Sequence, residues 1–245
     1  MGPFYKRAKH YLSNSIQRQQ MNLALKHLIE AERKAELLFA AIEERQLVCA
    51  GKTEKELNTE VFNLAFELFG IKKFWHKRIV RAAANTLLPY QANPPDLVLR
   101  EDEIVFFDFG PVFEEWEADY GRTYVLGNDP KKLKMQRDTE SAWVEGKAYF
   151  DAHRETITGA EFYQFTVELA RKYGWEYGNH HCGHLIGNFP HEKIVGEEEI
   201  NYIHPNNHQR MGDKDQHGND RFWIYEIHFV DLDEKIGGFV ERMVS

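Results

Sequence analysis

The sequence predicts an α+β fold, because two helices followed by a β-hairpin occur twice along the chain. Four helices are expected, over residues 17–46, 53–70, 130–153 and 158–174. Apolar runs typical of buried strands lie at 103–110 and 222–230, and each is followed by a second run that can fold back on it. We therefore expect a pseudo-two-fold, curved, barrel-like antiparallel sheet flanked by helices.

The helix boundaries follow from apolar spacing and from capping residues. The first helix carries an apolar stripe at helical spacing. Thr53 with Glu56, and Thr158 with Glu161, match the capping box that opens a helix. The polar segment 203–220 is rich in Asn, Asp, Gly and His, so we expect a long loop there, and such loops are often functional.

Composition and charge exclude several classes of protein. The 245 residues carry a net charge of −8, which argues against nucleic-acid binding, because phosphate contacts need clustered Lys and Arg. No apolar run reaches the roughly 18 residues that a membrane span requires. Two cysteines, Cys49 and Cys182, are too few for a disulfide framework. We expect a cytoplasmic protein that has no membrane contact.

Asp108 lies in the middle of the apolar run "EIVFFDFG". A lone carboxylate buried there would cost several kcal/mol or give up its charge, so it needs a partner. If the chain folds back about residues 113–114, Asp108 lies opposite Asp119. Directly opposed antiparallel residues project from the same face of a sheet, about 5 Å apart. Two carboxylates at that distance repel each other unless they are protonated or bridged by a cation.

The C-terminal run repeats this arrangement with two glutamates. Glu226 and Glu241 each lie inside an apolar strand, and a turn at residues 232–234 opposes them. Four carboxylates in one dry cavity need positive charge, which two-metal hydrolases supply with a pair of divalent cations about 3.5–4 Å apart. His184, at the start of the strand-like "HLIG", is the remaining candidate ligand.

These five residues resemble the pattern of the "pita-bread" metallopeptidases, a family that contains methionine aminopeptidase, aminopeptidase P, prolidase and creatinase. That pattern is an Asp, a second Asp eleven residues later, a His in a "GH-x-x-G" stretch, and two Glu on later strands. The resemblance covers nearly the whole chain and implies the pita-bread fold, with one metallopeptidase-like catalytic domain over 17–245. The short basic start of the chain, over 1–16, is expected to be a solvated N-terminal arm.

The resemblance implies a role for each of the five residues. Asp108 would bind one metal ion, His184 and Glu226 would bind the other, and Asp119 and Glu241 would bridge both. A water between the ions would attack the scissile carbonyl, and Glu226 would accept its proton. Mn²⁺ is the first expectation for the metal, with Co²⁺, Fe²⁺ or Zn²⁺ as alternatives, because one imidazole among carboxylates does not choose between them.

Two further histidines match the proline-directed branch, aminopeptidase P and prolidase. His180 lies four residues before His184, and His191 lies seven residues after it. The resemblance implies that both contact the substrate or the tetrahedral intermediate and take part in catalysis. The family usually has another histidine about eighteen residues before the first Asp ligand. That count ends on Tyr90, which we expect to be a substrate-binding residue in its place.

Other positions depart from the proline-directed pattern or carry no predicted catalytic role. Ile227 stands where these enzymes tend to have Pro, and Phe239 stands where they tend to have Arg. His76, in "FWHKRIV", could line the pocket. His181 and Cys182 are interpreted as structural.

The function that the resemblance implies is dinuclear-metal-dependent hydrolysis of a peptide bond near the N-terminus, as an aminopeptidase or dipeptidase of Xaa-Pro type. One alternative is a creatinase-like hydrolase, or a metal-dependent lyase, that acts on a small molecule. Another is a non-catalytic binding module, although such relatives generally lose metal ligands. The expected partners are a short peptide or a small-molecule substrate, and a second copy of the chain in a homodimer.

Overall fold

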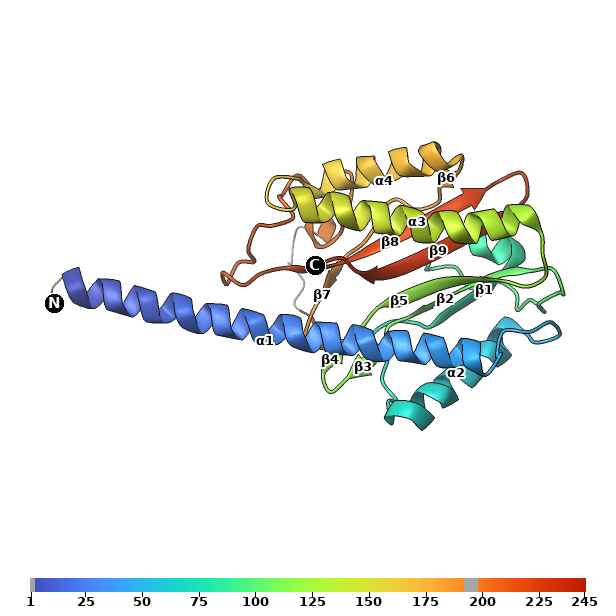
Figure 1. Cartoon of the computed structure of the whole chain (residues 1–245), viewed down its shortest axis with the longest axis horizontal. Helices are drawn as coiled ribbons and strands as arrows, with labels where there is room; N and C mark the ends of the chain where they lie inside the picture. Colours follow the sequence, from blue (N-terminus) through green and yellow to red (C-terminus); the bar gives the residue numbers. More distant parts are fainter. Residues whose placement is uncertain (1–2, 192–197) are drawn as a thin grey trace.

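The computed structural model describes residues 3–191 and 198–245 and confirms the α+β fold (Figure 1). The helices are α1 (Pro3–Glu44), α2 (Glu54–Phe69), α3 (Pro130–His153) and α4 (Gly159–Tyr173), with the short 3-10 helices η1 (Ala83–Leu87) and η2 (Glu198–Asn201). The strands are β1 (Ile79–Ala82), β2 (Ile104–Phe109), β3 (Val112–Phe113), β4 (Trp116–Glu117), β5 (Tyr120–Val125), β6 (Glu176–Tyr177), β7 (Leu185–Ile186), β8 (Phe222–Asp231) and β9 (Ile236–Met243). Both predicted capping boxes are present, at Thr53 and Thr158.

The first helix begins earlier than predicted. Helix α1 starts at Pro3 instead of near residue 17, so the expected arm over 1–16 is helical from its third residue. The physical reason is that neither glycine nor proline occurs between Pro3 and Gly51, so nothing in the sequence interrupts the helix. Figure 1 shows this N-terminal part extending beyond the sheet. No helix within residues 3–191 and 198–245 is long and apolar enough to cross a membrane.

In the described part of the chain, seven strands form one open antiparallel sheet. The strand order is β1-β2-β5-β9-β8-β6, and β7 pairs with β8. The two hairpins therefore meet at the centre of the sheet, where β5 pairs with β9. The pair β3–β4 forms a separate two-stranded sheet within the first hairpin.

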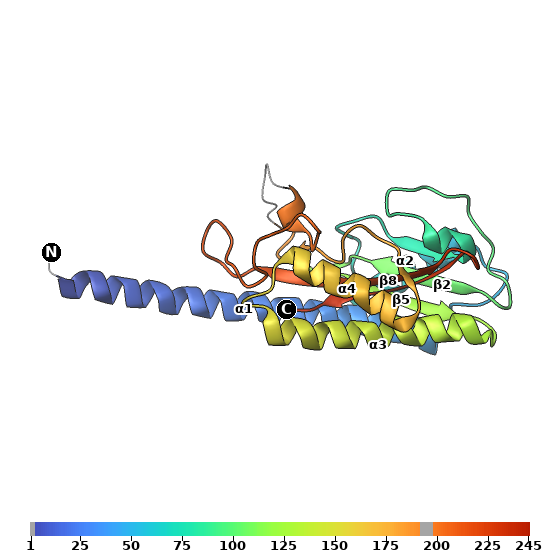
Figure 2. The same cartoon turned by 90° about the horizontal axis from the view of Figure 1, so that it is seen from above.

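All four long helices contribute to the apolar cores that cover one face of this sheet, and Figure 2 shows α1, α3 and α4 from a second direction. Phe107 and Phe109 of β2 pack against Phe39 of α1. Tyr225 of β8 packs against Phe162 of α4, with ring centroids 4.7 Å apart. Successive side chains of a strand point to opposite faces, so the neighbours of these aromatic residues point away from the helices. That second face carries the predicted carboxylates.

The register of the first hairpin differs from the prediction. Asp108 pairs with Gly121, not with Asp119. The turn is centred on Glu114 and Glu115, both of which have positive φ, because Phe113 and Trp116 pair on either side of them. A turn centred one residue later shifts every cross-strand partner by two positions, so Asp119 lies just before β5.

The register of the second hairpin agrees with the prediction. Glu226 and Glu241 are directly opposed in the β8–β9 pairing. Asp231 pairs with Ile236 at the end of the ladder, so the turn lies where the sequence indicated.

A buried carboxyl at the junction of α1 and β9 gives a testable pH dependence. Glu32 accepts the backbone N–H of Met243 at 2.8 Å, and burial raises the pKa of its carboxyl to about 7. The unfolded chain ionises this group near 4.5, so the folded state binds the proton more tightly between pH 4.5 and 7. Its contribution to stability is present below pH 4.5 and is lost as the pH rises through 7.

The variant Glu32→Gln is therefore expected to have a free energy of unfolding about 1–3 kcal/mol higher than that of the wild type at pH 8. Near pH 4.5 the two proteins are expected to be equally stable. Urea unfolding of both proteins at several pH values checks this. A stability difference that does not change with pH would contradict the assignment.

Candidate metal centre

The predicted carboxylates lie in one row across the open face of the sheet. Cross-strand pairing aligns Asp108 with Gly121, Gly121 with Glu241, and Glu241 with Glu226. Opposed residues project from the same face, so three carboxylates from β2, β9 and β8 point into one space. Gly121 keeps this space open, because a Cβ there would lie 2.6 Å from the ring of Phe239.

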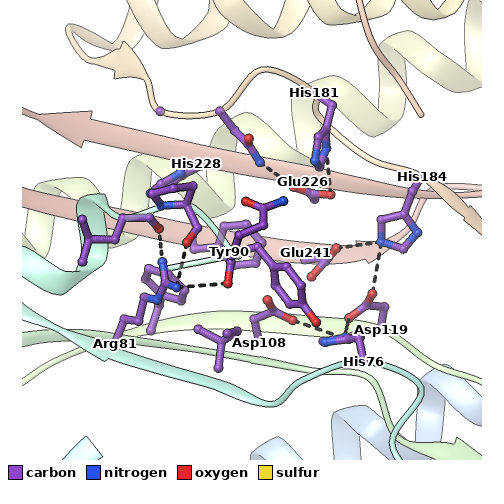
Figure 3. Close-up of a pocket in the computed structure, with 18 of the residues that line it drawn as sticks. His76, Arg81, Tyr90, Asp108, Asp119, His181, His184, Glu226, His228 and Glu241 are labelled. Carbon is purple, nitrogen blue, oxygen red and sulfur yellow. Dashed lines mark hydrogen bonds and ion pairs between the residues drawn. The ribbon is translucent and has the colours of Figure 1, made fainter. Parts of the chain in front are cut away.

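Asp119 and His184 complete the cluster from outside the row. Asp119 is two residues before Gly121, which places it on the same face of its strand. The Nε2 atom of His184 lies 3.2 Å from Oδ2 of Asp119 and 3.4 Å from Oε1 of Glu241. The structure therefore brings together all five predicted metal ligands, as Figure 3 shows.

The chain before His184 is held tightly against β8. Gly183 has φ of +144°, and a Cβ on it would lie 2.0 Å from the carbonyl oxygen of Ile224. The carbonyl of His184 accepts the N–H of Ile224, and that of Cys182 accepts the N–H of Glu226. Only glycine fits between these bonds, which is a physical reason for the glycine of the "GH-x-x-G" stretch.

The cluster lies in a cavity of about 350 Å³, within the size range of small-ligand sites. Phe106, Phe239 and Ile79 form an apolar part of its wall, and Arg81 and His228 also line it. Asp119, Glu226 and Glu241 are at most 4% exposed, so their charges are almost completely removed from water.

Burial and mutual repulsion set the protonation of the carboxylates. Burial raises the pKa of Asp108. Burial, together with the charges of Asp119 and Asp108, raises the pKa of Glu241 well above its usual range. Burial acts in the same direction on Asp119, but the nearby imidazoles of His76 and His184 outweigh it and lower the pKa of that carboxyl. Without a cation, the cluster reduces its charge by retaining protons.

The residues fit a site for divalent cations. Carboxylate oxygens and imidazole nitrogens are the donors that Mn²⁺, Co²⁺, Fe²⁺ and Zn²⁺ accept in proteins. Oδ1 of Asp108 is buried and has no hydrogen-bond partner in the described part of the chain. Asp119, His184 and Glu241 offer ligand atoms that all lie within 4.8 Å of one another, and so do His76, Asp108 and Asp119. A cation bound beside Oδ1 of Asp108 would explain why this buried oxygen has no hydrogen bond.

His76 is the residue whose position the sequence did not predict. It lies in the loop before β1, and its Nε2 atom is 3.0 Å from Oδ1 of Asp119 and 3.5 Å from Oδ1 of Asp108. The sequence indicated only that it could line the pocket. Because β1 pairs with β2 antiparallel, with Ile79 opposite Asp108, a residue just before β1 necessarily lies near the end of β2 where the carboxylates gather.

Tyr90 lines the same cavity but, in the described part of the chain, forms no hydrogen bond with the carboxylate cluster. Its hydroxyl oxygen accepts the backbone N–H of Lys77 at 2.9 Å, and its ring lies 6.0 Å from that of His76. The substrate-binding role of Tyr90 therefore stays a prediction. Its position at the wall, with the hydroxyl hydrogen still available to donate, is compatible with that role.

Tyr90→Phe gives a test of this role. Burial raises the pKa of the Tyr90 hydroxyl, so it stays protonated near neutral pH and cannot act as a base there. We expect the variant to raise KM by a few-fold, corresponding to about 1 kcal/mol for one hydrogen bond, and to leave kcat and its pH profile close to those of the wild type. A kcat lowered by about a hundredfold would instead assign Tyr90 to the chemical step.

Two further histidines of the "NHHCGH…PH" segment, His180 and His191, lie in different surroundings. His180 is exposed and lines the cavity. His191 is not among the described lining residues; its Nδ1 atom lies 2.7 Å from Oε2 of the buried Glu117, and its ring lies 5.4 Å from that of Trp75, which does line the cavity. The catalytic and substrate-binding roles of His180 and His191 stay predictions.

The sequence indicates a structural role for His181, but the structure shows that it lines the cavity beside Glu226. Its Nδ1 atom lies 3.4 Å from Oε1 of Glu226, and the side-chain amide of Asn179 donates to Oε2 at 3.3 Å (Figure 3). Burial tends to raise the pKa of Glu226, but His181 outweighs it and the pKa is lowered. Cys182 is fully buried in the core, as the structural interpretation implies.

Comparisons with known proteins agree with the fold and the site. The model of metallopeptidase family M24 matches residues 26–216. The chain is 28% identical to an Xaa-Pro dipeptidase of Pyrococcus horikoshii over 157 residues, which is 63% of this chain and 42% of that protein. The chain thus spans less than half the length of this curated relative.

Two solved structures share the fold. A prolidase from Thermococcus sibiricus superposes with a TM-score of 0.67 at 23% identity, over 88% of this chain and 55% of that one. A methionine aminopeptidase from Thermotoga maritima superposes with a TM-score of 0.62 at 18% identity, over 89% of this chain and 92% of that one.

The open antiparallel sheet, which carries the buried acidic cluster on one face, thus has the pita-bread fold of these solved structures. The match over residues 26–216 makes the assignment more specific: the chain belongs to metallopeptidase family M24. Membership of a metallopeptidase family implies divalent metal ions, and the buried cluster offers candidate ligands for them. Glu226 and Glu241 lie beyond the matched region, and it is the β8–β9 pairing that places them in the site.

Proposed function

We propose that this chain is a dinuclear-metal-dependent peptidase that hydrolyses a peptide bond near the N-terminus of a short peptide, with Xaa-Pro substrates as the first expectation. The observation that carries this proposal is the convergence of Asp108, Asp119, His184, Glu226 and Glu241 in one cavity. When bound, two divalent cations would acidify water and polarise a carbonyl. Mn²⁺ is the first metal to test.

Glu226 is the residue that would accept a proton during hydrolysis. Its pKa is lowered despite burial, because His181 and His184 lie nearby, and this favours the ionised carboxylate that a proton acceptor needs. The hydrogen bond from Asn179 orients its second oxygen. His180 is exposed and lines the cavity, and this position supports a role in passing protons between the site and solvent.

The cavity wall supports a small apolar residue beside the scissile bond. The rings of Phe106 and Phe239 pack with centroids 5.1 Å apart, and Ile79 lies in the same part of the wall. Such a surface suits the pyrrolidine ring of proline, which has no N–H to satisfy. The relatives named as Xaa-Pro dipeptidases and Xaa-Pro aminopeptidases are consistent with this substrate class.

Mass-spectrometric cleavage of a mixed peptide panel tests the proposal. The panel holds Xaa-Pro dipeptides, longer peptides with proline second, and peptides that begin with Met-Ala. Mn²⁺-loaded protein is compared with a chelated sample and with Glu226→Gln purified in the same way, which controls for contaminating peptidases. We expect metal-dependent loss of the proline substrates.

The panel also separates the alternatives. Preferential cleavage of the Met-Ala peptides would replace the proline specificity with that of a methionine aminopeptidase. Cleavage of no peptide, by protein shown to contain metal, would contradict the peptidase proposal and favour a hydrolase or lyase of a small molecule. Cytoplasmic location and a homodimer remain further predictions that size-exclusion chromatography and localisation can address.

A further inference from the structure

Two histidines from distant parts of the chain meet the acidic cluster in the same way. The Nδ1 atom of His184 lies 2.9 Å from the carbonyl oxygen of the next residue, Leu185. The Nδ1 atom of His76 lies 2.8 Å from the carbonyl oxygen of its own next residue, Lys77. A carbonyl oxygen only accepts, so in both rings Nδ1 carries the hydrogen and Nε2 faces the carboxylates.

Asp119 lies between the two imidazoles and presents one oxygen to each. Nε2 of His184 faces Oδ2 of Asp119 and one oxygen of Glu241, at 3.2 and 3.4 Å. Nε2 of His76 faces Oδ1 of Asp119 and one oxygen of Asp108, at 3.0 and 3.5 Å. Figure 3 shows these two sets side by side, with Asp119 shared between them.

We propose that His76 is a sixth protein ligand of the metal centre, so that each of the two cations binds one imidazole. This inference rests on the proposed metal centre and adds a ligand to it. His184 occupies a position that the five-residue pattern assigns to a ligand, and His76 has the same tautomer, the same type of carbonyl partner and the same shared carboxylate. A hydrogen bond from the second ring nitrogen to a carbonyl is typical of metal-binding histidines, since it fixes the ring and its tautomer.

The surroundings of His76 hold its ring in this position. A Cβ on Gly110 would lie 2.2 Å from Cδ2 of His76, so the ring occupies space that only a glycine leaves open. Trp75 packs edge-on against the rings of both His76 and His184, with centroids 4.4 and 5.2 Å away. Its indole N–H donates to the carbonyl of Ala118, directly before Asp119, which ties the two imidazoles and the shared carboxylate into one rigid unit.

A sixth ligand of this type changes the metal preference. The group formed by Asp108 and Asp119 would offer only oxygen donors without His76, as suits Mn²⁺ or Mg²⁺. With His76 it offers nitrogen and oxygen donors. This mixed set favours Co²⁺ and Zn²⁺ over Mn²⁺ more strongly than oxygen donors alone do. We therefore expect the centre to bind Co²⁺ more tightly than Mn²⁺ at both positions.

Cobalt binding to the metal-free protein tests this inference. Isothermal titration calorimetry and native mass spectrometry give the affinity and the number of ions, and X-ray absorption at the cobalt edge counts the imidazoles per ion. The wild type, His76→Ala and His180→Ala are compared. His180 is the matched control, because it is a histidine of the same cavity whose side chain forms no hydrogen bond or ion pair with the five proposed ligands in the described residues.

The wild type and His180→Ala are expected to bind two Co²⁺ ions with one imidazole each. His76→Ala is expected to bind one of them about a hundredfold more weakly or not at all, since the loss of a ligand's hydrogen-bond partner alone already costs about 10–100-fold. If His76→Ala does not fold by circular dichroism, His76→Gln, which keeps a polar side chain of similar size, is measured instead.

Two bound ions of wild-type affinity and an unchanged imidazole count in the His76 variant would overturn the inference. His76 would then face the substrate, and the five-ligand centre would stand. A wild-type protein that binds no Co²⁺ and no Mn²⁺ would instead overturn the metal centre itself, so the two failures are distinguishable.

Discussion

Glu226→Gln is expected to lower kcat/KM for the proline substrates by about 10²–10⁴-fold, the range that a positioned general base contributes. Glutamine has nearly the same shape and can still accept the hydrogen bond from Asn179, but it cannot take a proton. The melting temperature is therefore expected to stay close to that of the wild type. Steady-state kinetics at saturating Mn²⁺, with bound ions counted by native mass spectrometry, measure the effect.

Glu234→Gln is a matched control for this variant. Glu234 lies in the turn of the same β8–β9 hairpin, and its side chain is 59% exposed and outside the cavity. It should leave kcat/KM unchanged. Near-normal turnover in Glu226→Gln with both ions bound would contradict the role of Glu226 as base.

The second large effect is stabilisation by metal. A ligand that binds only the folded chain stabilises it by about 4 kcal/mol at a thousand times its dissociation constant, which in a chain of this length raises Tm by about 10 °C. Without the ions, four carboxylates share one cavity and at least two of them, Asp108 and Glu241, have raised pKa values. Differential scanning calorimetry with Mn²⁺ and with chelator measures the gain.

Asp119→Asn supplies the contrast for this measurement. Asp119 belongs to both groups of ligand atoms, so its loss should abolish most of the gain from Mn²⁺ while the metal-free variant still folds. Identical melting of the wild type with and without chelator would count against the site.

The sequence predicted the elements of the fold more accurately than their pairing. The starts of α2 and α4, at Thr53 and Thr158, were predictable because capping is a local interaction. The pairing of Glu226 with Glu241 was predictable because a short turn joins their strands. The Asp108–Asp119 pairing was wrong because Glu114 and Glu115 adopt positive φ, which non-glycine residues seldom do. A sequence pattern does not indicate that choice of turn.

The convergence of the five proposed metal ligands was predictable, and their surroundings were not. Asp108, Asp119, His184, Glu226 and Glu241 match a family pattern, and the structure brings them together in one cavity. His76 and His181 reach the cluster through contacts that depend on the β1–β2 register and on the path of the chain before β7. Such long-range contacts leave no periodic signal in the sequence, so local patterns could not separate these histidines from surface or core residues.

Anomalous diffraction from crystals of the protein soaked in Mn²⁺ would test the central claim most directly. The account predicts two peaks about 3.5–4 Å apart in the cavity, one beside Asp108 and the other beside His184 and Glu226, with Asp119 and Glu241 touching both. A protein that shows no peak in this cavity at saturating Mn²⁺, or binds the ion only at the surface, would contradict it.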